Sequence, residues 1–225
     1  MSYFIFKGIS SDTMGVILTE LPPITKPPKK YRKYDVIGKD GTEIKEDGYT
    51  SYPKPLSIGI KDPSNIDQII DWLDGSGQLI ISSEPDKFYT AKILEQADYT
   101  SLLRFRQATV VFEIQPFKYA VANDVITKTS PFSITNDGNY YCLPTLTIYG
   151  SGNVTVKLDG ADIFTITSVP SSITVDGMTH NCYNGAAKLN RKKIGDYLRL
   201  PTGTHTISWT GTVSKVEMAV NKRWL

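Results

Sequence analysis

Few side chains in this sequence have the type and spacing that chemistry requires. The only histidines are His180 and His205, and the only cysteines are Cys142 and Cys182. His180 and Cys182 are two residues apart, which is too close along one strand to act as base and nucleophile. The ligand spacings of zinc modules are missing too. We therefore expect no catalytic residue, no metal site and two free thiols.

Acidic and glycine-rich patterns also favour structural roles. Asp67, Asp71 and Asp74 follow Asp62 and recur at i, i+4 and i+7, so a solvated helix face is preferred to a metal site. Gly150-Ser151-Gly152-Asn153 resembles a phosphate loop, but it leads into an alternating strand instead of a helix. We interpret it as a hairpin turn and expect no cofactor.

A basic run precedes the next expected strand and continues into it. It comprises Lys26, Lys29, Lys30, Arg32 and Lys33, without an acid, and it is interleaved with Tyr31 and Tyr34. Aromatic interleaving favours nucleic-acid binding, but the net charge is only +2 and no nucleic-acid-binding motif is found. Docking onto an acidic patch of another subunit is the preferred interpretation, with a solvated loop as the alternative.

The whole sequence describes a globular, β-rich chain with room for two domains. A chain of 225 residues buries about 70% of its unfolded surface and needs no disulfide or metal to fold. Val, Ile, Thr, Tyr and Phe are plentiful, which favours strands. The opening residues predict a short strand instead of a signal peptide, and no apolar run is long enough to span a bilayer. We therefore expect synthesis in a cytoplasm and no membrane partner.

The first half predicts short strands around an unsupported hairpin. Two strands within residues 3–19 are followed by an extended Pro-rich segment, 21–28. Residues 31–37 and 42–46 flank an Asp-Gly turn and predict a hairpin. The hairpin carries few large apolar residues, and isolated hairpins are only marginally stable in water, so it needs support from elsewhere.

One helix is predicted, because apolar residues recur at i, i+3, i+4 and i+7. They are Ile66, Ile69, Ile70 and Leu73. Ser64 and Asp67 resemble a capping box. Strands are expected again at 55–61, 78–82, 87–94 and 102–114.

The second half predicts a β-sandwich. Residues 120–130 are small and polar and mark the domain junction, so we assign the domains to 1–125 and 126–225. Beyond the junction, turns recur every 8–12 residues, as in β-sandwiches. The expected strands are 131–135, 144–149, 153–158, 162–166, 171–175, 194–200, 203–209 and 212–220.

Two ordered series of motifs resemble the distal tail protein (Dit) family of tailed bacteriophages. The first is Phe6-Lys7-Gly8-Ile9, then Met14-Gly15-Val16, the Pro-rich segment, Val36-Ile37-Gly38-Lys39-Asp40-Gly41 and Gly48-Tyr49. The second is Asn136-Asp137-Gly138-Asn139, Pro144 to Gly152, Ile173-Thr174-Val175-Asp176, Leu200-Pro201-Thr202-Gly203, Ile207 to Gly211 and Asn221-Lys222-Arg223-Trp224. Together they cover nearly the whole chain.

The resemblance implies a mainly β protein that is a structural component and not an enzyme. Its N-terminal domain would be β-sandwich-like and related to the tail tube, with one helix and a projecting hairpin, and its C-terminal domain a galectin-like β-sandwich. Six copies would form a head-to-tail ring at the virion tail tip. The ring would join the major tail protein, or tail tube, to the tail-associated lysin or tail fibre and to the receptor-binding apparatus. DNA would only pass through its channel, and the protein would be made in the bacterial host cytoplasm.

Three hypotheses about residues follow. The subunit interface is predicted to use the hairpin residues Tyr31, Arg32, Tyr34, Val36, Ile37, Lys39, Asp40 and Ile44. An alternative function is a carbohydrate-binding module in host cell-wall attachment, with Tyr140, Tyr141, Tyr183 and Trp209 stacking on sugars, although Trp209 is better interpreted as a core residue. A wall hydrolase would need two suitably separated carboxylates, of which the sequence gives no sign.

Overall fold

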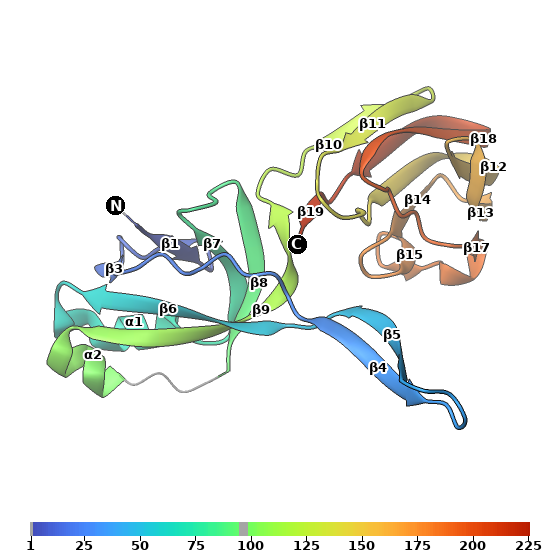
Figure 1. Ribbon diagram of the computed structural model, residues 1–225. Coiled ribbons are helices and arrows are strands. Elements are labelled where there is room, and N and C mark those ends of the chain that lie inside the picture. Colours follow the sequence, from blue (N-terminus) through green and yellow to red (C-terminus); the bar gives the residue numbers. More distant parts are fainter. Residues whose placement is uncertain (1, 95–98) are drawn as a thin grey trace. The chain divides into compact units, whose positions relative to one another are not determined.

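The computed structural model describes residues 2–94 and 99–225 and divides them into two compact units. The first spans Met1–Val121 together with Leu225, and the second spans Ala122–Trp224. Strands dominate both units, as the prediction of a mainly β chain requires (Figure 1).

The N-terminal unit is built on one antiparallel sheet with the order β2-β1-β7-β8-β9-β6-β3. Its strands are β1 (Phe4–Phe6), β2 (Ile9–Ser10), β3 (Val16–Leu18), β6 (Tyr52–Ile60), β7 (Ser76–Ile81), β8 (Lys87–Ile93) and β9 (Gln107–Ala120). Alternating side chains of β6 and β9 are buried, so these two long strands supply much of the core. Phe6 meets Phe112 of β9 edge-to-face within that core.

The predicted helix is present as α1 (Ile66–Trp72), preceded by the 3₁₀ turn η1 (Pro63–Asn65). Ile69 and Trp72 bury its apolar side, and the Trp72 indole N–H donates to the Phe6 carbonyl (3.0 Å). The capping-box prediction is wrong, because the Asp62 carboxylate accepts from the Ser64 N–H instead (2.9 Å).

A second helix, α2 (Tyr99–Phe105), lies where a strand was expected to begin. The prediction of a strand from residue 102 is therefore wrong for its first residues. Leu102 is fully buried in the core, and Arg106, with φ +59°, separates the helix from β9. The mixed apolar and basic residues of this stretch are compatible with the periodicity of either a helix or a strand, and the packing of Leu102 into the core selects the helix.

The C-terminal unit is a second antiparallel sheet system with its own core. The order is β10-β18-β12-β14-β15-β16, with β11 on β18, and β13 between β12 and β17. The strands are β10 (Val125–Lys128), β11 (Phe132–Asn136), β12 (Thr145–Leu158), β13 (Ala161–Val169), β14 (Ser172–Asp176), β15 (Asn181–Asn184), β16 (Ala187–Lys188), β17 (Lys193–Gly195) and β18 (Gly203–Ala219); a 3₁₀ turn, η2 (Asn190–Lys192), precedes β17. The short strand β19 (Arg223–Trp224) is not part of this sheet.

The turn predicted at residues 150–153 is absent, and two long strands run past each other there, with a glycine from each at the point of closest approach. Residues 150–153 lie inside β12, and 210–211 lie inside β18, a long curved ribbon in Figure 1. The two strands pair on both sides of a register shift. A Cβ at Gly150 would stand 2.1 Å from the Thr212 carbonyl oxygen, and one at Gly211 would stand 2.2 Å from that of Asn153. The hairpin-turn prediction at 150–153 is therefore wrong: glycine serves close strand approach here.

The predicted junction is also shorter than expected. Residues 125–128 form β10, which pairs with the C-terminal part of β18. Ile126 packs against the core of the unit, so this strand gains from tertiary contacts that its polar composition does not reveal.

Candidate functional site

The most distinctive feature of the N-terminal unit is a two-stranded arm, β4 (Lys29–Asp35) paired only with β5 (Thr42–Tyr49) (Figure 1). Nearly every residue of both strands is exposed, and none belongs to the buried core. The Lys39 N–H closes the turn by donating to the Val36 carbonyl (3.1 Å), with Gly38 at φ +82°. The predicted hairpin is thus present, with Val36 and Ile37 in its turn instead of its first strand.

Ion pairs within the arm use up much of the basic run. Arg32 donates through Nε (2.5 Å) and a terminal nitrogen (2.9 Å) to the Asp47 carboxylate, and this bond raises the pKa of Arg32 and lowers that of Asp47. Lys29 pairs with Glu46 at 2.5 Å. Counted over residues 29–49, six basic side chains face five acidic ones. The basic run from Lys26 to Lys33, which contains no acid, is therefore largely neutralised once β5 pairs with β4.

Apolar side chains remain exposed on both faces of the arm and at its tip. The pairing register places Tyr31 and Ile44 on one face and Tyr34 on the other. Ile44 is 62% exposed and Ile37, in the turn, is fully exposed at 102%. The remaining predicted interface residues, Val36, Lys39 and Asp40, are also exposed in the turn, and Lys39 pairs with Glu43. The structure therefore brings all the predicted interface residues onto one protruding element.

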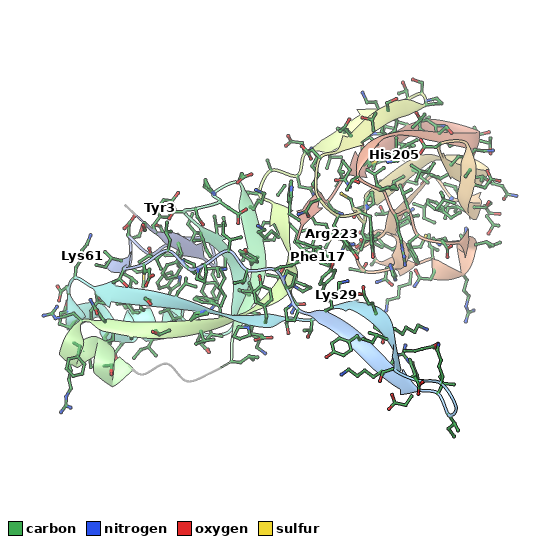
Figure 2. The ribbon with its side chains drawn as sticks, in the orientation of Figure 1. Tyr3, Lys29, Lys61, Phe117, His205 and Arg223 are labelled. Carbon is green, nitrogen blue, oxygen red and sulfur yellow. The ribbon has the colours of Figure 1, made fainter. Side chains whose placement is uncertain are left out.

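The Pro-rich segment that leads into the arm is tied down by buried polar side chains of β6. Lys54 is only 4% exposed, and its Nζ donates to the Pro23 carbonyl (2.9 Å). The Tyr52 hydroxyl donates to the Thr25 carbonyl (3.3 Å). At the base of the arm, Tyr49 packs edge-to-face on Phe117 of β9. Figure 2 labels Phe117. These contacts therefore fix the position at which the arm begins.

Lys54 belongs to a small polar cluster at the edge of the apolar core. Lys118, 7% exposed, donates to both carboxylate oxygens of Glu84 at 2.9 Å. Burial opposes ionisation of Glu84, but hydrogen bonds from Lys118 and Lys87 outweigh it and lower its pKa. Burial lowers the pKa of Lys54 and raises that of Tyr89.

Sequence analysis missed this cluster, although a signal was present. Extending the alternation of residues 55–61 backwards puts Lys54 and Tyr52 in phase with the buried Leu56 and Ile58. A lysine in phase with core positions indicates a buried ammonium that needs an acceptor.

The four aromatics proposed for sugar stacking do not share one surface. Tyr140 and Tyr141 lie together, with ring centroids 4.6 Å apart, and the Arg223 guanidinium lies 4.4 Å from the Tyr141 ring centroid. Tyr183 lies on β15, beside a hollow of about 380 Å³. Trp209 packs against the core of its unit near Phe132, in keeping with its interpretation as a core residue.

The histidines and cysteines occupy separate structural positions. Cys142 and Cys182 are free, as predicted. Both are also buried, which raises the pKa of both thiols, that of Cys142 to about 11. His180 stacks on Tyr197, while His205 pairs with Asp159 at 2.7 Å. Within residues 2–94 and 99–225, no three His, Cys, Asp or Glu side chains cluster as metal ligands. No helix among these residues has the length and hydropathy of a membrane span.

Comparison with known proteins gives a fold and no sequence family. No protein-family model matches the chain, and no curated protein sequence matches it significantly. Solved structures, in contrast, do match the chain.

One such structure is the Dit protein (gp 19.1) of SPP1, described as a paradigm of hub adsorption apparatus in phages that infect Gram-positive bacteria. The two structures align over 100% of both chains with a TM-score of 0.73 and 14% sequence identity. The chain therefore has the Dit fold, which confirms the fold predicted from the two motif series.

Proposed function

We propose that this protein is a structural hub component of a bacteriophage, or prophage-derived, tail tip. Six copies would close into a head-to-tail ring that joins the tail tube to the tail-associated lysin or fibre and to the receptor-binding apparatus. The full-length match to SPP1 Dit supports the hub role. The arm supports the ring, because it exposes apolar side chains that a neighbouring copy would cover.

The arm suits a contact between unlike surfaces of identical chains. One protomer offers β4–β5 and the next would receive them elsewhere on its own surface, which is a heterologous contact that closes at a fixed rotation. An obligate contact of this kind buries on the order of 2,000 Å² or more. Ion pairs inside the arm preserve its shape before docking, and its exposed apolar side chains supply the driving force.

We propose further that the role is structural and not catalytic. Burial raises the pKa of both thiols, so neither is a ready thiolate nucleophile near neutral pH. His205 lies in β18 and is held by Asp159 of the turn between β12 and β13. Zymography on bacterial cell walls should therefore show no clearing by the purified protein.

The ring is tested by removing the arm. Replacing residues 31–46 with a short Gly-Ser turn should leave folded monomers in light scattering, because both cores lie outside the arm. A ring that survives this deletion would refute the proposal.

Point variants sharpen the test. Ile37→Ser combined with Ile44→Ser should weaken association strongly while the melting temperature of the monomer stays within a degree or so, since exposed sites contribute little to folding. The matched control is Ile194→Ser, which removes an isoleucine of equal exposure to Ile44 (62%) from the C-terminal unit. If the unmodified protein, the double variant and the Ile194→Ser control all associated equally, the arm would not be the contact between subunits.

A further inference from the structure

The C-terminal unit contains a hollow of about 470 Å³ that none of the proposed roles uses. Ile163 of β13, His180, Asp196, Tyr197 and Arg199 line it. This volume lies within the range of small-molecule sites. His180 comes from the turn between β14 and β15, and the other polar residues follow β17, so separate loops converge on the hollow.

Hydrogen bonds and ring contacts hold the walls of the hollow in place. The Tyr197 hydroxyl donates to the His180 carbonyl (2.7 Å), and the two rings stack with centroids 4.6 Å apart. The Lys193 ammonium lies 3.9 Å from the Tyr197 ring centroid. The Asp196 N–H donates to the Ile163 carbonyl (3.1 Å). Little ordering would therefore be needed on binding.

The charged groups of the lining balance each other and keep hydrogen-bonding capacity. Asp196 and Arg199 form no ion pair within 4.0 Å among the residues that the structure describes. The Arg199 guanidinium lies 5.5 Å from the Tyr141 ring centroid, which restrains it. The lining itself therefore carries one carboxylate and one guanidinium and no net charge, and the ammonium of the neighbouring Lys193 already donates to the Gly195 carbonyl (2.7 Å). The carboxylate and the guanidinium suit a neutral ligand that both donates and accepts hydrogen bonds.

We propose that this hollow binds a neutral saccharide. Sugar hydroxyls donate to the Asp196 carboxylate, and sugar oxygens accept from the Arg199 guanidinium. The apolar C–H face of the sugar ring packs against the His180–Tyr197 ring pair and Ile163. Of the aromatics predicted to stack on sugars, Tyr141 acts only indirectly, by holding Arg199. The site lies within one unit and stands independently of ring assembly.

Titration of the full-length protein with neutral sugars tests the proposal. The probes are glucose, galactose, N-acetylglucosamine and its β-1,4-linked dimer, followed by nuclear magnetic resonance shifts and calorimetry. At least one should bind saturably, with a Kd on the order of 1 mM as expected for a small polar ligand. Asp196→Asn and Arg199→Gln should each weaken that binding about tenfold, because each removes charge-assisted hydrogen bonds.

The matched control is Asp162→Asn, which neutralises an exposed carboxylate of the same unit that pairs with Lys157 instead. It should leave sugar affinity unchanged. Absence of saturable binding by all four sugars at about 20 mM, well above such a Kd, would overturn the proposal. Unaltered affinity in both pocket variants, or binding of inorganic phosphate in place of sugar, would overturn it as well. None of these outcomes bears on ring formation, which is measured by mass.

Discussion

At the scale of single residues, Gly211 shows how one missing side chain lets two long strands pass each other. Its φ is +105°, and a Cβ would stand 2.2 Å from a backbone oxygen of β12. Gly150 makes the reciprocal approach from β12. The bend of the sheet therefore depends on glycine for space as well as for conformation.

We expect Gly211→Ala to destabilise the C-terminal unit by about 2 kcal/mol or more, since it combines a strained φ with a backbone clash. Differential scanning calorimetry of the full chain would measure the change. Gly152→Ala is the matched control, because Gly152 also has a positive φ, +72°, but has open space around its Cβ position. Equal losses in both variants would show that close approach contributes nothing.

His205 supplies a pH-dependent contact on the C-terminal unit (Figure 2). The hydrogen bond to Asp159 raises the pKa of His205 above its ordinary value of 6.5, with a smaller contribution from the Thr202 carbonyl. A raised pKa in the folded state means that the stabilisation is complete below pH 6.5. It is lost as the pH rises through the folded-state pKa.

We therefore expect His205→Gln to lower the melting temperature at about pH 6 and to have progressively less effect towards about pH 9. Asp159 is ionised throughout this window because hydrogen bonds from the Thr206 N–H and from His205 lower its pKa. Melting curves of both proteins at several pH values give the measurement. A difference that stayed constant with pH would exclude a protonation-linked contribution.

At the scale of elements, the strap formed by residues 22–25 sets where the arm begins. It makes no regular backbone pairing, so its position depends on side chains of β6. Of these side chains, Lys54 is expected to hold the strap most firmly. Its buried ammonium needs a hydrogen-bond acceptor, and the Pro23 carbonyl provides it.

Lys54→Met keeps the aliphatic stem and removes the donor, so we expect the strap to become mobile while the sheet stays folded. A spin label at a cysteine replacing Ile24, which is 71% exposed, would report this as a narrower resonance spectrum. Both native cysteines are buried, so labelling is selective. Lys215→Met, at a partly exposed lysine of the C-terminal unit, serves as the control. An unchanged spectrum in Lys54→Met would show that other contacts hold the strap.

The sequence predicted elements well where local chemistry decides them. The arm follows from an Asp-Gly turn between short strands, and α1 follows from its apolar spacing. The predictions are wrong where contacts with residues distant in the sequence determine the secondary structure. The core environment of Leu102 favours a helix over a strand, and pairing with β18 turns the polar stretch 125–128 into a strand. The hollow proposed to bind sugar is lined by residues between 163 and 199 that separate loops bring together, so no short motif could reveal it.

At the scale of the whole molecule, the apolar surface of the arm is energetically unfavourable in water unless assembly buries it. Its isoleucines and tyrosines are exposed to solvent, and none of them belongs to either hydrophobic core. Head-to-tail docking of each arm on the next copy would remove this exposure in a closed ring, whereas a chain of any length keeps one uncovered arm. Closure is therefore favoured over open chains. Six chains of 25.0 kDa would give a particle of about 150 kDa.

Mixing provides the strictest test of this geometry. The arm-deleted chain keeps the surface that receives an arm but cannot offer one, so each copy that joins an assembly prevents its closure. We expect the closed ring to disappear much faster than in proportion to the fraction of deleted chain, and short open assemblies to appear. Native mass spectrometry of dissociated and reassembled mixtures would count both species. A strictly proportional loss of rings would mean that the deleted chain never engages its neighbours through a shared receiving surface. In that case, a symmetric contact between identical patches would replace the head-to-tail ring.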